Sequence, residues 1–452
     1  MDFPSSEVKV ISECFVKPKT MPEKWEEAYH LSLMGHFMLS LYYIQKGLLF
    51  LKPSNGAIKP KYFMETFLQK LTDSLATALV PFYPLAGRLS SSLTDDASSY
   101  SVFADCNNSP GAKFIHAKSD LSVGDIVGSK YVPLVVQSFF DHHKALSGDD
   151  HTMSLLSIKV TELMDGVFIG LSMNHAIGDG SSFWQFFNSL SEIFNSQEET
   201  TYNKLLRLKN PPIFREGSGP ICSLPLSKPD DSIRRMEPPV WKERMFHFSS
   251  ETVRSLKSKA NQECGTTTIS SFQSLIAFLW RSITRARKLP NDQETTCRLT
   301  AGNRSRMVPP LHMNYFGVYV SLVKATIKTG NLLENEFGWA ALKLHQAVAQ
   351  HNDEKISSDM DRWLKSPSNL RFFDTNVVHV GSSPWFNKYG SEFGMGKAVA
   401  VRSGYGNKVD GKVSAYPGRE GGGSIDLEVC LLPEIMEALE SDQEFMSIVS
   451  QA

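Results

Sequence analysis

The strongest constraint on the fold is a long internal stretch, residues 205–240, that cannot form a regular helix or a central strand. It is rich in proline, glycine, serine and charge, as in NPP at 210–212 and GSGP at 217–220. Proline fixes φ and removes a backbone donor, so we predict an ordered crossover loop. The loop divides the 452-residue chain into two domains of similar size, 1–204 and 241–452.

Both parts mix strands and helices. In the first part, apolar residues at helical spacing predict a helix over 61–79, and two β-prone runs around an Asp-Gly turn, 155–163 and 167–174, predict a hairpin. The second part is predicted to contain helices at 268–287, 331–350 and 434–440 and strands at 299–303, 318–324, 377–380, 398–403 and 425–432. Strands and helices that alternate in this way favour an α/β fold.

A histidine, His175, closes the second strand of the hairpin and begins the sequence HAIGDG. Gly178 and Gly180 permit a tight turn and support the loop. An aromatic-rich helical pattern follows, with Ser181 or Ser182 as the expected N-cap. In α/β proteins, functional groups are often placed where a strand ends. His175 is therefore the first candidate for a functional side chain.

The pattern alone leaves more than one role open for His175. A neutral imidazole, with an ordinary pKa near about 6.5, can accept a proton at neutral pH. His175 and Asp179 could also bind a metal, but no third ligand is evident, and the adjacent His142 and His143 do not face one way. A histidine at a strand end can also hydrogen-bond a loop. We predict no metal site, and the general base and the structural role stay open.

Other catalytic motifs do not fit the sequence. A serine hydrolase needs the nucleophile elbow GxSxG, which the glycine and serine residues around Ser181 and Ser218 do not form. No phosphate-binding glycine loop is followed by a helix. The glycine-rich PGREGGG at 417–423 precedes a predicted strand, so we interpret it as a loop.

Composition argues against several classes of partner. The formal net charge is −1 without a basic stripe, which is unlike a nucleic-acid-binding protein. The six cysteines are scattered without a CxxC pair, so neither a zinc site nor a disulfide framework is expected. No apolar run has the length of a membrane span, and the N-terminal residues lack a signal-peptide pattern. We therefore expect a cytoplasmic protein that does not bind membranes.

Several segments together resemble the plant BAHD acyl-CoA-dependent acyltransferases. HAIGDG at 175–180 matches the family's HxxxDG, and YPLAGRL at 83–89 matches its YPLAGR segment. GNRSRMVPP at 302–310 with YFG at 315–317 is similar to DxRxRxxPPLPxxYFGN, and EFGMGK at 392–397 occupies the place of DFGWG. The segments occur in the family's order and cover nearly the whole chain.

This resemblance implies two chloramphenicol-acetyltransferase-like domains with a channel between them. It also implies that His175 removes a proton from the hydroxyl or amine of a small-molecule acceptor, which then attacks the thioester of acyl-CoA directly. Acyl-CoA would be a co-substrate, and no cofactor would stay bound. Asp179 of the motif would turn away into a salt bridge, with Arg304 as the first choice of partner and Arg306 as the second. The protein would be a monomer.

The resemblance assigns the remaining site residues only by position. Lys259, Ser270 and Ser271 are candidates for contacts to coenzyme A. The channel and the acceptor pocket are expected to involve Phe316, Ser382, Ser383, Phe393 and Gly394.

The sequence departs from the family pattern at several of these segments. Asn303 replaces an aspartate, Val318 replaces an asparagine, Glu392 replaces an aspartate and Met395 replaces a tryptophan. These changes leave the acyl group and the acceptor open, because pocket shape sets discrimination. Two alternatives are an elimination catalysed by His175 without coenzyme A, and a non-catalytic binding protein of the same fold.

Overall fold

The computed structural model describes most of the chain, including both predicted domains. The described residues are 8–450 apart from 22–24, 26–27, 54–61, 94–98, 108, 150, 197–199, 201–202, 204, 206–207, 215–223, 226–239 and 366–375. Most of the predicted crossover loop lies outside the described residues. In the described part of this loop, Ile213 forms an isolated β-bridge with Tyr315.

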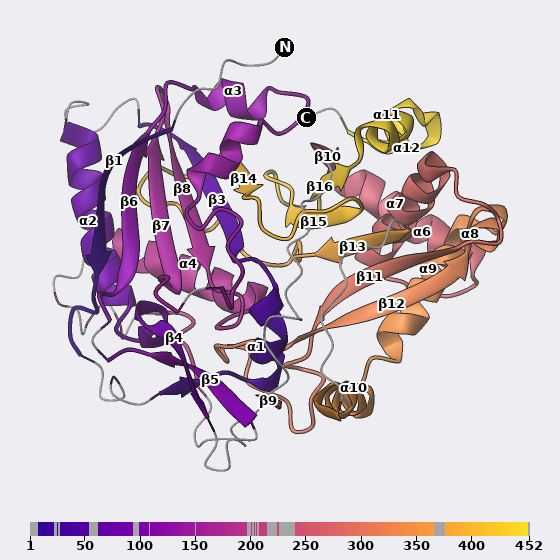
Figure 1. The fold of residues 1–452 in the computed structure, drawn as a ribbon. Coiled ribbons are helices and arrows are strands. Elements are labelled where there is room, and N and C mark those ends of the chain that lie inside the picture. Colours follow the sequence, from indigo (N-terminus) through magenta and orange to yellow (C-terminus); the bar gives the residue numbers. More distant parts are fainter. Residues whose placement is uncertain are drawn as a thin grey trace.

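Two six-stranded sheets lie side by side, one built mainly from each part of the chain (Figure 1). The first sheet has the order β1 (Lys9–Val16), β6 (Ala112–Lys118), β7 (Leu156–Glu162), β8 (Gly166–Met173), β3 (Ile44–Leu51) and β14 (Ala400–Ser403). The second sheet has the order β10 (Lys242–Phe248), β16 (Ile425–Leu431), β15 (Lys412–Pro417), β13 (Val377–Gly381), β11 (Glu294–Gly302) and β12 (Val320–Lys328). A smaller sheet contains β2 (Tyr29–His30), β5 (Ser99–Asp105), β4 (Arg88–Leu93) and β9 (Leu224–Pro225).

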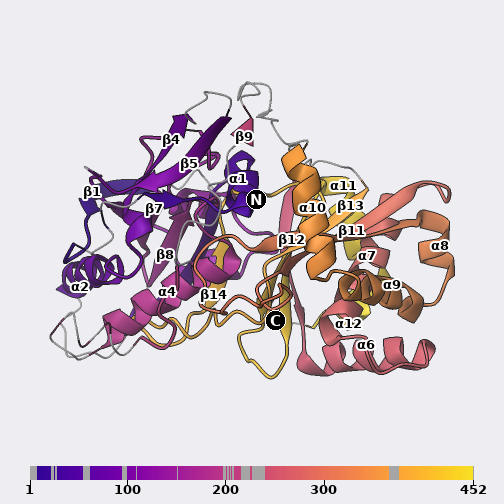
Figure 2. The ribbon, with the colours of Figure 1, turned by 90° about the horizontal axis from the view of Figure 1, so that it is seen from below.

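Helices pack against both large sheets, which confirms the α/β class. The first part contains α1 (Leu33–Phe37), α2 (Phe63–Ala78), α3 (Val123–Val127), α4 (Gly180–Asn195) and the short 3-10 helices η1 (Met38–Ser40), η3 (Tyr83–Ala86) and η4 (Leu134–Phe139). The second part contains α6 (Ser250–Glu263), α7 (Ser271–Arg287), α8 (Thr329–Glu334), α9 (Phe337–Ala349), α10 (Asp353–Lys365), α11 (Pro433–Ser441) and α12 (Gln443–Ile448). Figure 2 shows α6, α7 and α9 gathered on one side of the second sheet.

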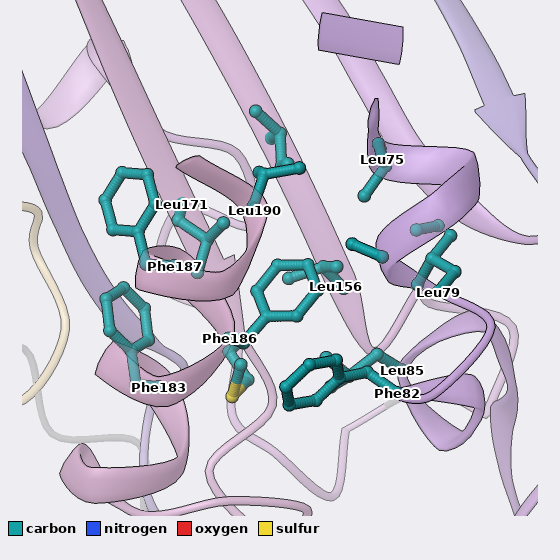
Figure 3. Close-up of a cluster of buried hydrophobic side chains, with 14 of the residues drawn as sticks. Leu75, Leu79, Phe82, Leu85, Leu156, Leu171, Phe183, Phe186, Phe187 and Leu190 are labelled. Carbon is teal, nitrogen blue, oxygen red and sulfur yellow. The ribbon is translucent and has the colours of Figure 1, made fainter. Parts of the chain in front are cut away.

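The helix that follows His175 is fixed by a dense apolar core. The apolar face of α4 packs against α2 and against the strands β7 and β8, as Figure 3 shows. The fully buried side chains of this contact include Leu75, Leu79, Leu156, Leu171, Phe183, Phe186, Phe187 and Leu190. Each large apolar side chain that is removed from water stabilises the fold by about 1.5–3 kcal/mol. The start of α4, and with it the loop that carries His175, therefore has little freedom to shift.

The predicted hairpin is confirmed, whereas the predicted helix over 331–350 is wrong in one respect. Strands β7 and β8 pair antiparallel across the Asp-Gly turn. The predicted helix is interrupted between α8 and α9, where Asn335 has an extended backbone. The guanidinium of Arg281 donates to the carbonyls of Leu332, Leu333 and Asn335 at this break. A side chain that satisfies the last carbonyls of a helix lets the helix end there.

Strand β14 connects the two parts of the molecule. It belongs to the C-terminal part of the sequence, yet it pairs antiparallel with β3 at the edge of the first sheet, with Arg402 opposite Gly47 (Figure 1). In the resulting strand order, β3 lies between β14 and β8. Residues from the C-terminal part of the chain therefore lie two strands away from β8, the strand that ends before His175.

Candidate active site

The backbone around His175 is held by hydrogen bonds to a turn at Ser147. The amide nitrogen of the buried Asn174 side chain donates to the carbonyl of Ser147 at 2.8 Å, and its oxygen accepts from the backbone N–H of Ala176 at 3.0 Å. The backbone N–H of His175 donates to the Ser147 hydroxyl at 2.9 Å. Neither supporting residue was predicted from the sequence. Asn174 directly precedes the HxxxD motif, so its position could have suggested a supporting role, whereas no local pattern indicates Ser147.

Replacing Asn174 with alanine is expected to lower kcat by roughly tenfold, because the loop loses two hydrogen bonds of about 1 kcal/mol each. The KM values should change less than kcat, since the side chain supports the loop and is buried behind it. Steady-state kinetics on the purified variant measure this. Asn195→Ala, at the exposed end of α4, is the matched control. An Asn174→Ala variant with unchanged kcat would contradict the supporting role.

The imidazole of His175 is suited to accept a proton. The residue is half-buried, and its Nδ1 is enclosed without a hydrogen-bond partner among the described residues. This leaves Nε2 as the nitrogen that can meet a substrate. Burial lowers the pKa of His175 below its ordinary value, and the positive charge of Lys412 acts in the same direction, whereas Asp179 opposes it. The ring is therefore neutral at neutral pH.

Asp179 begins helix α4, and the hydrogen-bond partners of its carboxylate are groups other than His175. Its carboxylate accepts from the backbone N–H groups of Ser181 at 3.0 Å and Ser182 at 3.1 Å. Asp179 is thus the N-cap, and the prediction of Ser181 or Ser182 at this position is wrong. The physical reason is that a carboxylate satisfies the free N–H groups of the first turn and is favoured by the helix dipole.

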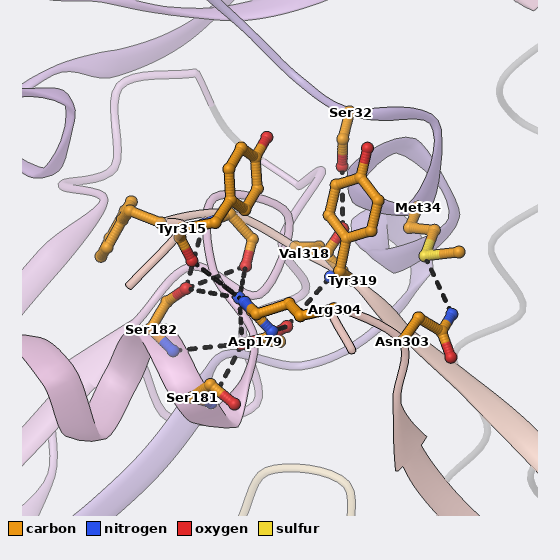
Figure 4. Close-up of polar contacts among 12 residues, drawn as sticks. Ser32, Met34, Asp179, Ser181, Ser182, Asn303, Arg304, Tyr315, Val318 and Tyr319 are labelled. Carbon is orange, nitrogen blue, oxygen red and sulfur yellow. Dashed lines mark hydrogen bonds and ion pairs between the residues drawn. The ribbon is translucent and has the colours of Figure 1, made fainter. Parts of the chain in front are cut away.

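The predicted ion pair between Asp179 and Arg304 is confirmed. The guanidinium donates from Nη1 to Oδ2 at 2.7 Å and from Nη2 to Oδ1 at 3.1 Å (Figure 4). Asp179 is fully buried, and Arg304 is 3% exposed. Asp179 Oδ2 also accepts from the backbone N–H of Tyr319 at 2.9 Å. The pair therefore joins helix α4 of the first part to the connection between β11 and β12 of the second.

The remaining bonds of Arg304 fix the same connection, and they exclude the second choice of partner. Arg304 donates to the carbonyls of Tyr315 and Gly317 and to the Ser182 hydroxyl. Arg306 is not a partner of Asp179, because its guanidinium donates to the carbonyls of Val348 at 3.2 Å and His351 at 2.8 Å. Arg306 therefore ties the β11–β12 connection to the end of α9.

The two glycines of the motif are explained by close packing. A Cβ at Gly178 would lie 3.0 Å from Cβ of Ser182, and one at Gly180 would lie 3.3 Å from the ring of Phe386. Neither glycine has a positive φ. The tight turn expected of these glycines therefore does not depend on a positive φ. They are explained by the small space that their neighbours leave beside the loop.

The aromatic residues expected at the channel lie inside the first hydrophobic core. Phe316 is fully buried, with its ring centroid 5.4 Å from that of Phe82. Phe393 is 1% exposed and packs against Phe187 and Phe194 of α4, with centroids 5.6 and 5.7 Å away. These rings support the start and the end of α4 from behind.

Gly394, Ser382 and Ser383 lie in the two turns that follow β13. Gly394 has φ +70°, which follows Phe393 at φ +47°, so the chain turns sharply there. The Ser382 hydroxyl and the Ser383 carbonyl accept from Nζ of Lys388 at 2.9 and 3.0 Å. Lys388 is fully buried, and this burial sets its pKa well below the ordinary lysine value.

The three residues considered for coenzyme A lie on α6 and at the start of α7. Ser270 is the N-cap of α7 and forms a capping box with Gln273. Ser271 is the first residue of the helix. Lys259 is exposed and forms a 3.8 Å ion pair with Glu263. These contacts account for the helix ends and neither require nor oppose a bound nucleotide.

The described part of the chain shows neither a cluster of metal ligands nor a membrane-spanning helix. No three histidine, cysteine, aspartate or glutamate side chains within it are grouped so as to hold a metal ion. None of its helices combines the length and the apolar character that crossing a membrane demands.

Comparison with known proteins places the chain in a family. Residues 6–446 match the model described as the Transferase family. The chain is 35% identical over 458 residues to an uncharacterised acetyltransferase of Arabidopsis thaliana, covering 98% of this chain and 99% of that protein. It is 32% identical over 455 residues to the BAHD acyltransferase DCR of the same plant, covering 97% and 92%.

A solved structure shares the fold. TRI101 of F. sporotrichioides, complexed with coenzyme A and T-2, superimposes with a TM-score of 0.71 at 16% identity, covering 94% of this chain and 99% of that one. The sequence matches, the two-sheet fold and the buried Asp179–Arg304 pair next to His175 agree with the resemblance seen in the motifs. The chain therefore belongs to the transferase family of the BAHD acyltransferases, and it is an acyltransferase.

Proposed function

We propose that this enzyme transfers an acyl group from a coenzyme A thioester to the hydroxyl or amine of a plant specialised metabolite, with His175 as general base. The observation that carries the proposal is the half-buried, neutral imidazole at the end of β8, held by Ser147 and Asn174. The coenzyme A bound in the structure of TRI101 supports the choice of donor.

The reaction follows from the state of His175. Its free nitrogen takes the proton of the acceptor while the acceptor oxygen or nitrogen attacks the carbonyl carbon of the thioester. The tetrahedral intermediate then collapses, and the imidazolium returns the proton to the sulfur of the departing coenzyme A. A positioned general base of this kind contributes about 10²–10⁴-fold to the rate.

The cysteines support direct attack without an acyl-enzyme. Of the cysteines that the structure describes, Cys106, Cys297 and Cys430 are buried. Burial raises the pKa of Cys106 to about 12, and it raises the pKa of Cys297 and Cys430 as well. Since the thiolate is the nucleophilic form of cysteine, such thiols are poor nucleophiles at neutral pH.

The test is release of free thiol from a panel of acyl-CoAs with hydroxylated and amine acceptors. We expect thiol release that requires both the acceptor and His175. Conversion of an acceptor without any coenzyme A would instead favour the elimination. Binding of acceptors without conversion, with coenzyme A neither bound nor consumed, would favour the non-catalytic alternative.

The pH dependence of kcat/KM should reflect the burial of His175. The pKa of this ring is lowered, so the neutral, proton-accepting form persists below the ordinary histidine range. Protonation of His175 should therefore not limit activity as pH falls from about 8 toward 6.5, and the loss caused by this ring should begin only at lower pH. Initial rates across a buffer series of constant ionic strength measure this. An acidic limb centred above the ordinary histidine pKa would contradict the assignment.

A further inference from the structure

One face of strand β15 lies against the first sheet near His175. Lys412, Ser414 and Tyr416 alternate along β15 and share this face. From the first sheet, Nζ of Lys46 donates to the Ser414 hydroxyl at 3.3 Å and to the Tyr416 hydroxyl at 2.9 Å. Lys46 is on β3, which pairs directly with β8, the strand that ends before His175. The two sheets therefore meet through polar side chains toward the end of β8, where Ile44 of β3 pairs with Met173.

The buried carboxylates of this polar layer already have partners. Lys408 forms ion pairs with Glu243 and with Glu428, the latter at 3.8 Å. Glu428 also accepts from the hydroxyls of Tyr416, at 3.2 Å, and Ser403. Lysine side chains nevertheless outnumber carboxylates here. The basic residues of the layer are Lys46, Lys388, Lys408, Lys412 and Arg402, and its acidic residues are Glu243 and Glu428.

Lys412 differs from the other lysines of the layer. Lys46 and Lys388 each donate to hydroxyl or carbonyl oxygens. The amino group of the half-buried Lys412 makes no hydrogen bond or ion pair with any residue that the structure describes. Burial lowers the pKa of Lys412 to about 7, and the charge of Lys46 adds to this effect. An ammonium group in such surroundings is costly unless an anion accompanies it.

The space for this amino group depends on Gly381. Strand β13 pairs with β15, which brings Gly381 opposite Ser414. A Cβ at Gly381 would lie 2.6 Å from Nζ of Lys412, so the lysine side chain passes where any other residue would put its side chain. The positive charge of Lys412 also contributes to the lowered pKa of His175. The amino group thus lies against the end of β13, on the face of β15 that meets the first sheet.

We propose that Lys412 binds a carboxylate of the substrate beside His175, carried by the acyl acceptor or by the acyl group. This inference rests on the proposed acyl transfer and narrows its substrate class to acids. A carboxylate would supply the missing counter-ion and accept charge-assisted hydrogen bonds from the ammonium group. Fixing one end of the substrate in this way would orient its reacting group toward His175.

The test measures binding without turnover, in a His175→Ala background, and its first arm contains no coenzyme A. The probes are shikimate, quinate, anthranilate and 4-coumarate, each compared with its methyl ester by titration calorimetry. A second arm compares malonyl-CoA with acetyl-CoA, so that a carboxylate on the acyl group is distinguished from one on the acceptor. We expect at least one acid of either arm to bind about tenfold or more tightly than its neutral counterpart.

Three variants assign that preference to Lys412. Lys412→Met should abolish it, and Lys412→Arg should retain part of it. Gly381→Ala should weaken it, because the added methyl displaces the amino group while the flexible lysine side chain can move aside without unfolding. Lys328→Met, an exposed lysine on β12 of the same sheet, is the matched control and should keep the preference.

The inference is overturned if every acid binds like its neutral counterpart, or if the preference survives in Lys412→Met. Its failure is distinguishable from failure of the proposed function. If wild-type enzyme releases thiol equally with substrates that have and that lack a carboxylate, acyl transfer is supported and the carboxylate site is not. If Lys412 binds carboxylates but no thiol is released, the site is supported and acyl transfer is not.

Discussion

Replacing His175 with alanine is expected to lower the rate of thiol release by about 10²–10⁴-fold while the thermal midpoint of unfolding stays close to that of wild type. The rate falls because no other group replaces the proton acceptor. Stability is retained because the ring nitrogen Nδ1 has no hydrogen-bond partner among the described residues, so alanine leaves no buried group unpaired. The hydrogen bond from the backbone N–H of residue 175 to Ser147 survives any substitution except proline.

Steady-state kinetics and differential scanning fluorimetry on the same preparation separate the two effects. His151→Ala, which removes an exposed histidine from a turn, is the control and should change neither quantity. A His175→Ala enzyme with wild-type turnover would eliminate the general base. A loss of turnover that merely follows a loss of folded protein would assign His175 a structural role, the alternative that the sequence pattern left open.

Local sequence patterns were sufficient for elements whose stabilising contacts are local. The Asp-Gly turn between two β-prone runs predicted the hairpin of β7 and β8. The helical pattern over 268–287 predicted α7, which begins at Ser271. The Asp179–Arg304 pair was predicted because the family resemblance supplied a contact between distant segments. Composition and periodicity alone do not indicate which charged side chains form ion pairs.

Elements determined by distant contacts were not predictable in the same way. The sequence of β14 predicts a strand, but nothing in that sequence indicates that the strand pairs with β3 of the first sheet. The break between α8 and α9 depends on Arg281, on another helix. In the site, Ser147 and Lys412 gain their importance only from the neighbours that the fold brings to them.

The second large effect is expected at Asp179. Asp179→Ala should lower the free energy of unfolding by about 3–5 kcal/mol, because it leaves the guanidinium of Arg304 buried without its counter-charge. The variant also loses the N-cap of α4, whose removal usually costs about 1 kcal/mol. Turnover should fall together with stability, since the loop that carries His175 leads directly into this cap.

Denaturant unfolding followed by both fluorescence and circular dichroism measures the loss, and Ser181→Ala is the matched control. Ser181 contributes only its backbone N–H to the cap, so its variant should keep wild-type stability. In the double variant Asp179→Ala/Arg304→Met, the loss should be smaller than the sum of the two single losses, because neither charge is left buried alone. A well-folded Asp179→Ala protein with a wild-type midpoint and only a slower reaction would contradict this account, since it would place the carboxylate in the chemistry. The buried bidentate contact with Arg304, which occupies both carboxylate oxygens, is the reason to expect the opposite.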